Sequence, residues 1–180
     1  MQIGNFFKHK INGSGYQVII GNDTLIDQYC SIGDYTYIGN RCVVTKAQIG
    51  RYVSIGNDVS IGLGEHNISR VSTSHFIYEH KIDWYKELTQ KDIVIKNDVW
   101  IGASPVIRRG ITVGNGAVIG ANSFVNHDVP SFAVVAGSPA KIIKYRFESD
   151  VIDKINNSKW WDYPLEEARK IVDSLENTIF

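Results

Sequence analysis

The sequence has few of the features of a secreted, membrane or nucleic-acid-binding protein. Only two of its 180 residues are cysteine, too few for a disulfide framework. Its 19 basic and 19 acidic residues balance, so no net charge attracts nucleic acid or an anionic membrane surface. No apolar run is long enough for a membrane span, and the segment MQIGNFFKHKING lacks the apolar stretch of a signal peptide. We therefore expect a cytoplasmic protein that does not bind nucleic acid.

What the sequence does contain is a repeat of six residues. The first block of aliphatic positions consists of Ile20, Ile26, Ile32, Ile38, Val43, Ile49, Ile55 and Ile61. Successive members are six residues apart, except for one step of five residues between Ile38 and Val43. The second block consists of Ile95, Ile101, Ile107, Val113, Ile119 and Val125. A period of six fits neither a helix face nor simple strand alternation. It predicts an all-β solenoid, a parallel β-helix in which each hexad is a short strand plus a turn.

A small or β-branched residue tends to lie four positions after each of these aliphatic residues. Cys30 and Cys42 both occupy this position, after Ile26 and Ile38. They could form a disulfide or half of a metal site, but two ligands twelve residues apart are weak evidence for either. We interpret both as small buried hydrophobic residues of the solenoid core.

Two segments depart from the repeat. The first, GLGEHNISRVSTSH at residues 62–75, interrupts it before the pattern resumes at Ile95. The second begins at Glu148, where glycine disappears and helix signals begin. Ser149 is expected to cap a short helix, and Pro164 to open a second one. The apolar face of the second helix is expected to comprise Leu165, Ala168, Ile171, Val172 and Leu175.

These departures predict the organisation of the chain. We expect a β-helix domain over residues 1–147, with an excursion loop over 64–92, and a helical extension over 148–180. The extension could cap the open end of the solenoid or pack on a neighbouring subunit.

Several motifs of the second block and the tail resemble those of hexapeptide-repeat acetyltransferases. These motifs are DVWIG at 98–102, AGSPAK at 136–141, RF at 146–147 and WW at 160–161. The WW pair resembles the xenobiotic branch of that superfamily, the streptogramin and chloramphenicol acetyltransferases. The resemblance implies a left-handed β-helix, acetyl-CoA as co-substrate without a metal, and a homotrimer whose active sites lie between subunits.

The interruption also has a counterpart in that branch, whose long loop carries an N-H-R-like element followed by an S-T-x-P-F-like one. Here these positions read Glu65-His66-Asn67 and Ser72-Thr73-Ser74-His75-Phe76. The resemblance implies that His66 is the catalytic base, and histidine can accept a proton near neutral pH. His75 departs from the pattern by replacing the proline. We expect the loop to form the acceptor site, with contacts from His75, Phe76 and Trp84.

The resemblance also implies a binding site for acetyl-CoA. It assigns to that site Trp100, Ala103, Ala121, Asn126, His127, Lys141 and Lys144. Ala103 and Ala121 would contribute backbone contacts, whereas Asn126 and His127 replace a common T-K pair. Trp100 lines the cofactor channel or packs at a corner. Lys141, Lys144 and Arg146 form a local cationic cluster suited to the phosphates of CoA.

The acceptor is open between several classes. The first block has no long insertion, unlike the xenobiotic enzymes, and the compact form favours a saccharide O-acetyltransferase. An antibiotic O-acetyltransferase and an amino-sugar N-acetyltransferase share this chemistry. A remoter alternative is a metal enzyme similar to γ-type carbonic anhydrases, because His75 and His80 have the spacing of two of their ligands.

Overall fold

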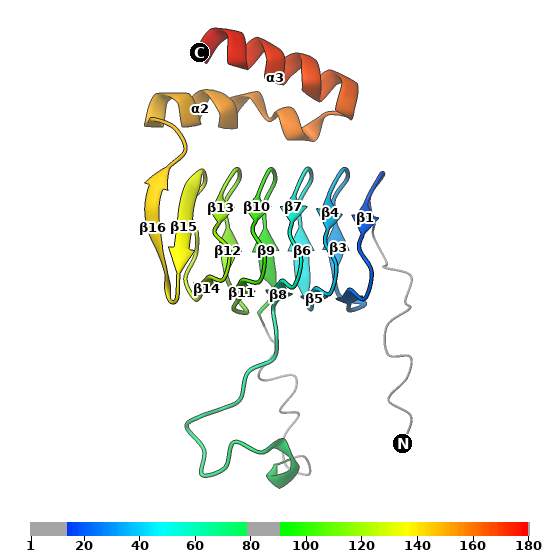
Figure 1. Cartoon of the computed structure of the whole chain (residues 1–180), viewed down its shortest axis with the longest axis vertical. Coiled ribbons are helices and arrows are strands. Elements are labelled where there is room, and N and C mark those ends of the chain that lie inside the picture. The colour runs from blue at the N-terminus through cyan, green and yellow to red at the C-terminus, as the bar shows by residue number, and fades with distance from the viewer. Residues whose placement is uncertain (1–13, 79–90, 180) are drawn as a thin grey trace.

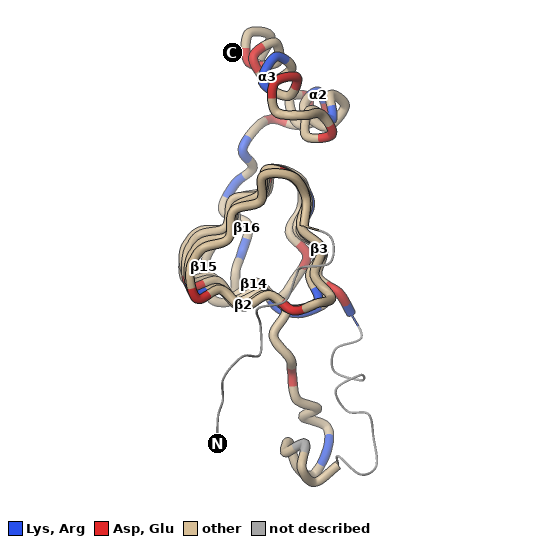
Figure 2. Tube along the Cα trace, turned by 90° about the vertical axis from the view of Figure 1, so that its right-hand side faces the viewer, with Lys and Arg blue, Asp and Glu red and all other residues tan. Residues whose placement is uncertain are grey.

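The computed structural model describes residues 14–78 and 91–179 of the chain. Over these residues the chain winds into stacked coils whose strands form three sheets, the sides of a triangular prism (Figures 1 and 2). All pairings between coils are parallel, except for an antiparallel pair at the C-terminal end of the solenoid. The prediction of a parallel β-helix is confirmed.

Each of the first four coils contributes one strand to each of the three sheets. The seven-stranded sheet contains β1 (Ile19–Ile20), β4 (Tyr37–Ile38), β7 (Ser54–Ile55), β10 (Trp100–Ile101), β13 (Val118–Ile119), β15 (Ala133–Gly137) and β16 (Ala140–Tyr145). The five-stranded sheet contains β2 (Leu25–Ile26), β5 (Val43–Val44), β8 (Ser60–Ile61), β11 (Val106–Ile107) and β14 (Phe124–Val125). The four-stranded sheet contains β3 (Ser31–Ile32), β6 (Ala47–Ile49), β9 (Ile93–Ile95) and β12 (Thr112–Val113).

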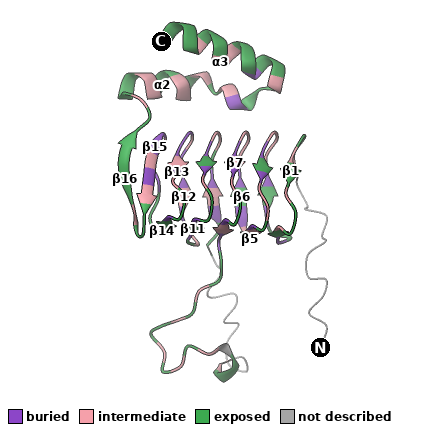
Figure 3. Cartoon of the chain, viewed as in Figure 1, coloured by how far each residue is buried: buried purple, intermediate pink, exposed green. Residues whose placement is uncertain are grey.

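Equivalent residues of successive coils stack in register. Ile55 pairs with Ile101, and Ile101 pairs with Ile119. These three side chains are 0% exposed, whereas Trp100, one position earlier, points outward and is 56% exposed. Figure 3 shows the same alternation along the prism. The six-residue period therefore arises because each two-residue strand turns one aliphatic side chain into a narrow core.

The position of the five-residue step in the repeat differs from the prediction. Val44, and not Val43, is the inward residue of β5, because Val44 is 0% exposed and pairs with Ile26 and Ile61. The short step thus lies between Val44 and Ile49. Two adjacent valines satisfy the sequence pattern equally well, and only the register between coils distinguishes them.

The excursion loop leaves the solenoid at one corner without breaking the stack. The chain exits after β8 and returns at β9, yet β8 pairs directly with β11 and β6 with β9. We call this edge of the prism, between the five-stranded and four-stranded sheets, the loop corner. Figure 1 shows the loop on one side of the solenoid and the C-terminal helices on the other.

The tail comprises α2 (Ser149–Ser158), a short 3-10 helix η2 (Trp160–Asp162) and α3 (Leu165–Ile179). The predicted apolar face of α3 is confirmed, since all five of its residues are buried or half-buried. The capping prediction is wrong: Ser149 is the first helical residue, and Glu148 occupies the N-cap position without a side-chain cap bond. No helix of the described ranges is both long and apolar enough to cross a membrane.

Contacts from the tail hold it against the solenoid. The Tyr52 hydroxyl donates a hydrogen bond of 2.8 Å to the Tyr163 carbonyl, and the Tyr52 ring lies 5.0 Å from that of Trp160. Trp161 is 4% exposed. The helices therefore cover the edge of the prism between the four-stranded and seven-stranded sheets, away from the loop corner (Figure 2).

The two cysteines are free and buried, as the repeat predicts. Cys30 is 2% exposed and Cys42 is 0% exposed. Burial raises the pKa of the Cys30 thiol to about 12, with a smaller contribution from Asp27, and burial also raises the pKa of Cys42. Both thiols are therefore protonated core groups at neutral pH.

We expect neither cysteine to react with a disulfide reagent such as DTNB while the protein is folded. The thiolate is the reactive form, and both the raised pKa values and burial suppress it. At about pH 8 the native protein should release almost no thionitrobenzoate, whereas protein in guanidinium should release it from both thiols. Rapid labelling of native protein would contradict the buried positions.

Candidate active site

His66 lies in the excursion loop, close to the point at which the loop leaves the solenoid. Its Nδ1 atom is 2.7 Å from the Thr73 carbonyl oxygen. A carbonyl only accepts hydrogen bonds, so Nδ1 must carry the ring proton of the neutral imidazole. Nε2 then holds a lone pair and can accept a proton. The side chain is exposed, so a substrate can reach this nitrogen.

Glu65, although adjacent to His66, is engaged by a different residue. Arg108 donates two parallel hydrogen bonds to its carboxylate, from Nε to Oε1 and, at 2.6 Å, from Nη2 to Oε2. The Arg108 guanidinium holds the pKa of Glu65 below its usual range, so Glu65 remains a carboxylate at neutral pH. The group that orients the imidazole is the Thr73 carbonyl.

The backbone at the loop exit is fixed by hydrogen bonds from the solenoid. The Gly62 N–H donates to the Ile107 carbonyl at 3.0 Å. The Gly62 carbonyl accepts hydrogen bonds from the Arg109 guanidinium and from the Thr45 hydroxyl. Gly62 has φ +72°, a left-handed conformation that favours glycine.

A groove runs beside this exit along the five-stranded sheet. It has a volume of about 290 Å³ and is lined by Leu63, Gly64, Glu65, Val106, Ile107, Arg108 and Phe124. Its walls are mainly apolar, and the Glu65–Arg108 ion pair forms its polar end. The groove is thus mainly apolar and includes Glu65, the residue next to His66, in its lining.

The residues expected to contact acetyl-CoA are spread around the prism. Ala103 and Ala121 occupy one edge, between the seven-stranded and five-stranded sheets, where the Asn122 N–H donates to the Ala103 carbonyl at 3.0 Å. Asn126 and His127 follow β14 at the loop corner, and their side chains are 2.6 Å apart. Trp100 lies on the outer face of the seven-stranded sheet, on a different side of the prism.

The expected cationic cluster is smaller than the sequence suggests. Lys141 and Lys144 lie exposed on β16. Arg146 is used elsewhere, because its Nη1 donates to Gly116 at 2.8 Å and to Asp98 at 3.2 Å. Its guanidinium also lies 5.1 Å from the centre of the Phe147 ring. Arg146 therefore fixes the base of the tail.

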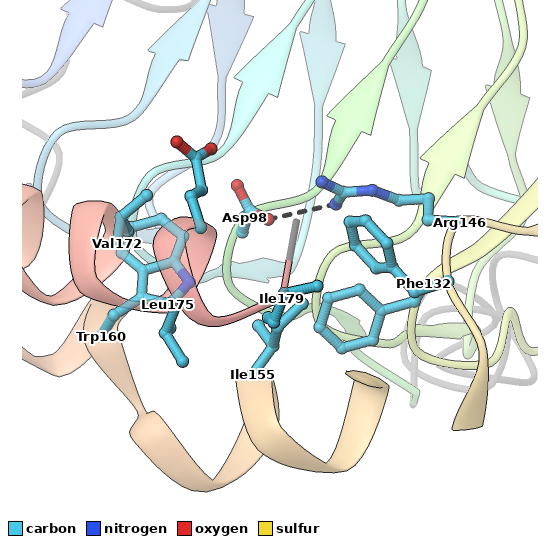
Figure 4. A pocket seen from close by; sticks show the side chains of 10 residues that line it. Asp98, Phe132, Arg146, Ile155, Trp160, Val172, Leu175 and Ile179 are labelled. Atoms are coloured by element: carbon cyan, nitrogen blue, oxygen red, sulfur yellow. Dashed lines mark hydrogen bonds and ion pairs between the residues drawn. The ribbon is translucent and has the colours of Figure 1, made fainter. Parts of the chain in front are cut away.

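The Asp98–Arg146 pair borders a cavity of about 250 Å³ between the tail and the solenoid (Figure 4). Its apolar lining comes from Phe132, Phe147, Ile155, Trp160, Val172, Leu175 and Ile179. Burial raises the pKa of Asp98, and Arg146 opposes that shift. This cavity lies where the tail packs against the solenoid, and most of its lining residues come from the tail.

The expected acceptor residues are placed only in part. His75 and Phe76 form the short 3-10 helix η1 (His75–Ile77), and Phe76 is 71% exposed. Trp84 and His80 lie outside the described residues. Within the described ranges no group of three His, Cys, Asp or Glu residues could hold a metal ion.

Sequence reasoning missed Thr73, Arg108 and Arg109. Thr73 acts through its backbone carbonyl, which no residue type reveals. The two arginines did carry a signal, since Arg108-Arg109-Gly110 follows the core residue Ile107 at the corner where the loop departs. Their partners, Glu65 and Gly62, become evident only once β11 is stacked on β8.

Comparison with other proteins identifies related acetyltransferases, although no family model matches the chain. A chloramphenicol acetyltransferase of Agrobacterium fabrum is 39% identical over 129 residues, 67% of this chain and 62% of the relative. A probable macrolide acetyltransferase of Lysinibacillus sphaericus is 33% identical over 150 residues, 79% of each. A galactoside O-acetyltransferase of Escherichia coli is 34% identical over 116 residues, 64% of this chain and 53% of the relative. The chain thus spans less than two thirds of the chloramphenicol and galactoside enzymes.

Solved structures have the same architecture. A hexapeptide-repeat acetyltransferase of Vibrio cholerae, complexed with acetyl coenzyme A, has a TM-score of 0.64 and 31% identity, covering 77% of this chain and 73% of that one. A galactoside acetyltransferase in complex with coenzyme A has a TM-score of 0.58 and 26% identity, covering 76% and 69%.

The fold and the loop define a class: parallel β-helices of hexapeptide coils with a histidine on an excursion loop. Together with these relatives they identify the chain, which belongs to the hexapeptide-repeat acetyltransferase family. The resemblance read from the DVWIG and AGSPAK motifs is confirmed.

We expect Gly62→Ala to destabilise the loop exit and Gly64→Ala to have little effect. A Cβ at Gly62 would lie 2.3 Å from the Thr45 carbonyl oxygen, in a left-handed conformation, whereas a Cβ at Gly64 meets nothing within 4 Å. Strain of this kind costs about 1–3 kcal/mol. Denaturant unfolding should show that loss for Gly62→Ala alone. Equal stability of the two variants would contradict the described exit turn.

Proposed function

We propose that this protein transfers an acetyl group from acetyl-CoA to a hydroxyl of a saccharide or a saccharide precursor, with His66 as general base. The observation that carries the proposal is the 2.7 Å contact between His66 Nδ1 and the Thr73 carbonyl. It places the proton on Nδ1 and leaves Nε2 to take the proton of the acceptor hydroxyl.

The chemistry follows from that tautomer. The acceptor oxygen attacks the thioester carbonyl as Nε2 removes its proton, and the resulting imidazolium returns a proton to the departing thiolate of CoA. A positioned base contributes about 10² to 10⁴ in rate. Thr73, which accepts from Nδ1–H, also stabilises the imidazolium, because its carbonyl dipole faces the positive ring.

Acetyl-CoA as donor is supported by the neighbours, whose structures contain acetyl coenzyme A or coenzyme A. The apolar groove lined by Leu63, Gly64 and Glu65 suits the uncharged arm of the cofactor, and Lys141 and Lys144 suit its phosphates. The use of acetyl-CoA also supports a cytoplasmic location.

A homotrimer is part of the proposal. His66 lies at the loop corner, whereas Trp100, Lys141 and Lys144 lie on the seven-stranded sheet. Side chains on different sides of one prism point apart, so a neighbouring subunit would complete a site that uses both groups. Strongly exposed apolar side chains on the loop, Ile68, Val71 and Phe76, are consistent with such a contact.

The acceptor has two candidate classes. The compact chain and the galactoside O-acetyltransferase relative support a saccharide. An antibiotic is the second candidate, because the chloramphenicol acetyltransferase relatives are more similar in sequence, at up to 39% identity. Acetylation of an amino-sugar nitrogen would use the same base.

We expect His66→Ala to retain its fold and assembly but to lose acetyl transfer by about 10² to 10⁴-fold. CoA release from acetyl-CoA measures the transfer, while circular dichroism and gel filtration monitor the fold and the assembly. Turnover near that of the wild type would remove His66 as the base.

The acceptor is tested by the same CoA-release assay with methyl galactoside, maltose, glucosamine, chloramphenicol and a macrolide. We expect the saccharide hydroxyl acceptors to give the highest kcat/KM. A preference for chloramphenicol or the macrolide would instead assign the antibiotic function. Activity that depends on stoichiometric zinc or iron would support the metal-enzyme alternative and overturn the proposal.

A further inference from the structure

The solenoid positions the proposed catalytic loop through a specific pair of charged side chains. We infer that Arg108 and Glu65 form a clamp that positions His66 for the reaction, so that both are positioning residues. The inference rests on the proposed function of His66. It adds two residues that do not themselves touch the reacting atoms.

One half of the clamp belongs to the rigid solenoid. Arg108 directly follows β11, and its N–H donates to the Val125 carbonyl of the next coil at 2.9 Å. In the opposite direction, Ile107 accepts from the Gly62 N–H of the preceding coil. The backbone around Arg108 is therefore held between two coils, so the Arg108 side chain extends from a backbone of fixed position.

The other half belongs to the loop. Between the anchored exit at Gly62 and the base at His66 lie only Leu63, Gly64 and Glu65. Leu63 is 40% exposed, and a Cβ at Gly64 would touch nothing within 4 Å. Neither residue restrains the path of the chain, and glycine allows a wide range of backbone angles. The bond from Arg108 to Glu65 is the restraint immediately before the base.

The geometry of the clamp favours orientation as well as attraction. Two parallel N–H···O bonds fix the carboxylate plane relative to the guanidinium plane, which a single contact would not do. An exposed ion pair contributes little to global stability. Its loss should therefore leave the fold intact while releasing the loop. The Thr73 carbonyl accepts from the His66 ring and so fixes its tautomer. The Arg108–Glu65 pair restrains the backbone just before His66, so the two restraints are separate.

The chain supplies a matched control. Arg41 and Asp58 form the same type of exposed, two-bond pair between adjacent coils, with distances of 2.7 and 2.8 Å. That pair lies at the edge between the seven-stranded and five-stranded sheets, away from the loop corner. Arg41→Gln removes an equivalent interaction without touching the loop.

The test is a double-mutant cycle of Arg108→Gln, Glu65→Gln and the double variant, with Arg41→Gln as control. Kinetics are measured with acetyl-CoA and the best acceptor among methyl galactoside, maltose and chloramphenicol. A misplaced catalytic group loses about 10- to 100-fold in rate. We expect each single variant to lose that factor in kcat, with KM for acetyl-CoA within about threefold. The double variant should lose no more than either single one.

Three kinetic outcomes would overturn the inference. These are a wild-type kcat in either single variant, multiplicative losses in the double variant, and a raised KM with unchanged kcat. The last would mean that the pair acts on binding in the groove. Arg41→Gln should match the wild type, and an equal loss of kcat in it would show a general effect of removing charge.

Hydrogen exchange of the loop separates this inference from the proposed function. Peptides covering residues 62–74 should exchange several-fold faster in Arg108→Gln and Glu65→Gln than in the wild type or Arg41→Gln. This measurement needs no substrate. If the wild type acetylates nothing while the exchange result holds, the proposed function fails and the clamp remains. Unchanged exchange in both variants would overturn the clamp.

Discussion

The structure depends on the ladder of backbone hydrogen bonds between stacked coils. Ser54 donates to Val99, and Trp100 donates to Ala117, at 2.8 and 2.9 Å. Each coil is held mainly by its two neighbours, so a residue inserted within a strand would shift one ladder relative to the other two. An insertion at a corner leaves all three ladders in register. This is why a long excursion between β8 and β9 is compatible with a continuous prism.

The same architecture separates rigidity from reactivity. A solenoid strand two residues long offers one outward side chain, at an angle set by the sheet. A loop can instead place a histidine ring over the surface of the solenoid. The loop must then be restrained if the ring is to keep one orientation. Here the restraints are the exit turn at Gly62, the Arg108–Glu65 pair and the Thr73 carbonyl. The exit turn at Gly62 is buried, whereas the ion pair and the Thr73 contact are exposed, so the loop beyond Gly62 is held by few and exposed contacts.

The sequence predicts the solenoid well because its signal is repeated in every coil. Ile55, Ile101 and Ile119 each indicate the same inward position of the repeat, so a wrong assignment at one coil does not change the assignment of the others. The errors occur where the signal is local: two adjacent valines leave the inward one undecided, and Ser149 competes with Glu148 for the N-cap position. His66 could be chosen only by resemblance. Its partners could not be predicted, because they depend on the register between coils and on a backbone carbonyl.

The prism also limits where a complete site can form. Outward side chains on one side diverge from those on the next, so Trp100 on the seven-stranded sheet and His66 at the loop corner cannot converge on one small ligand within a chain. Either only one of them contacts the ligand, or a second chain brings its own prism alongside. The apolar side chains exposed on the loop favour the second arrangement, because a surface of this kind is stabilised by being covered. The shape of the scaffold therefore links the proposed chemistry to the proposed assembly: if His66 is the base and Trp100 contacts the cofactor, the two act on one substrate only across two neighbouring prisms.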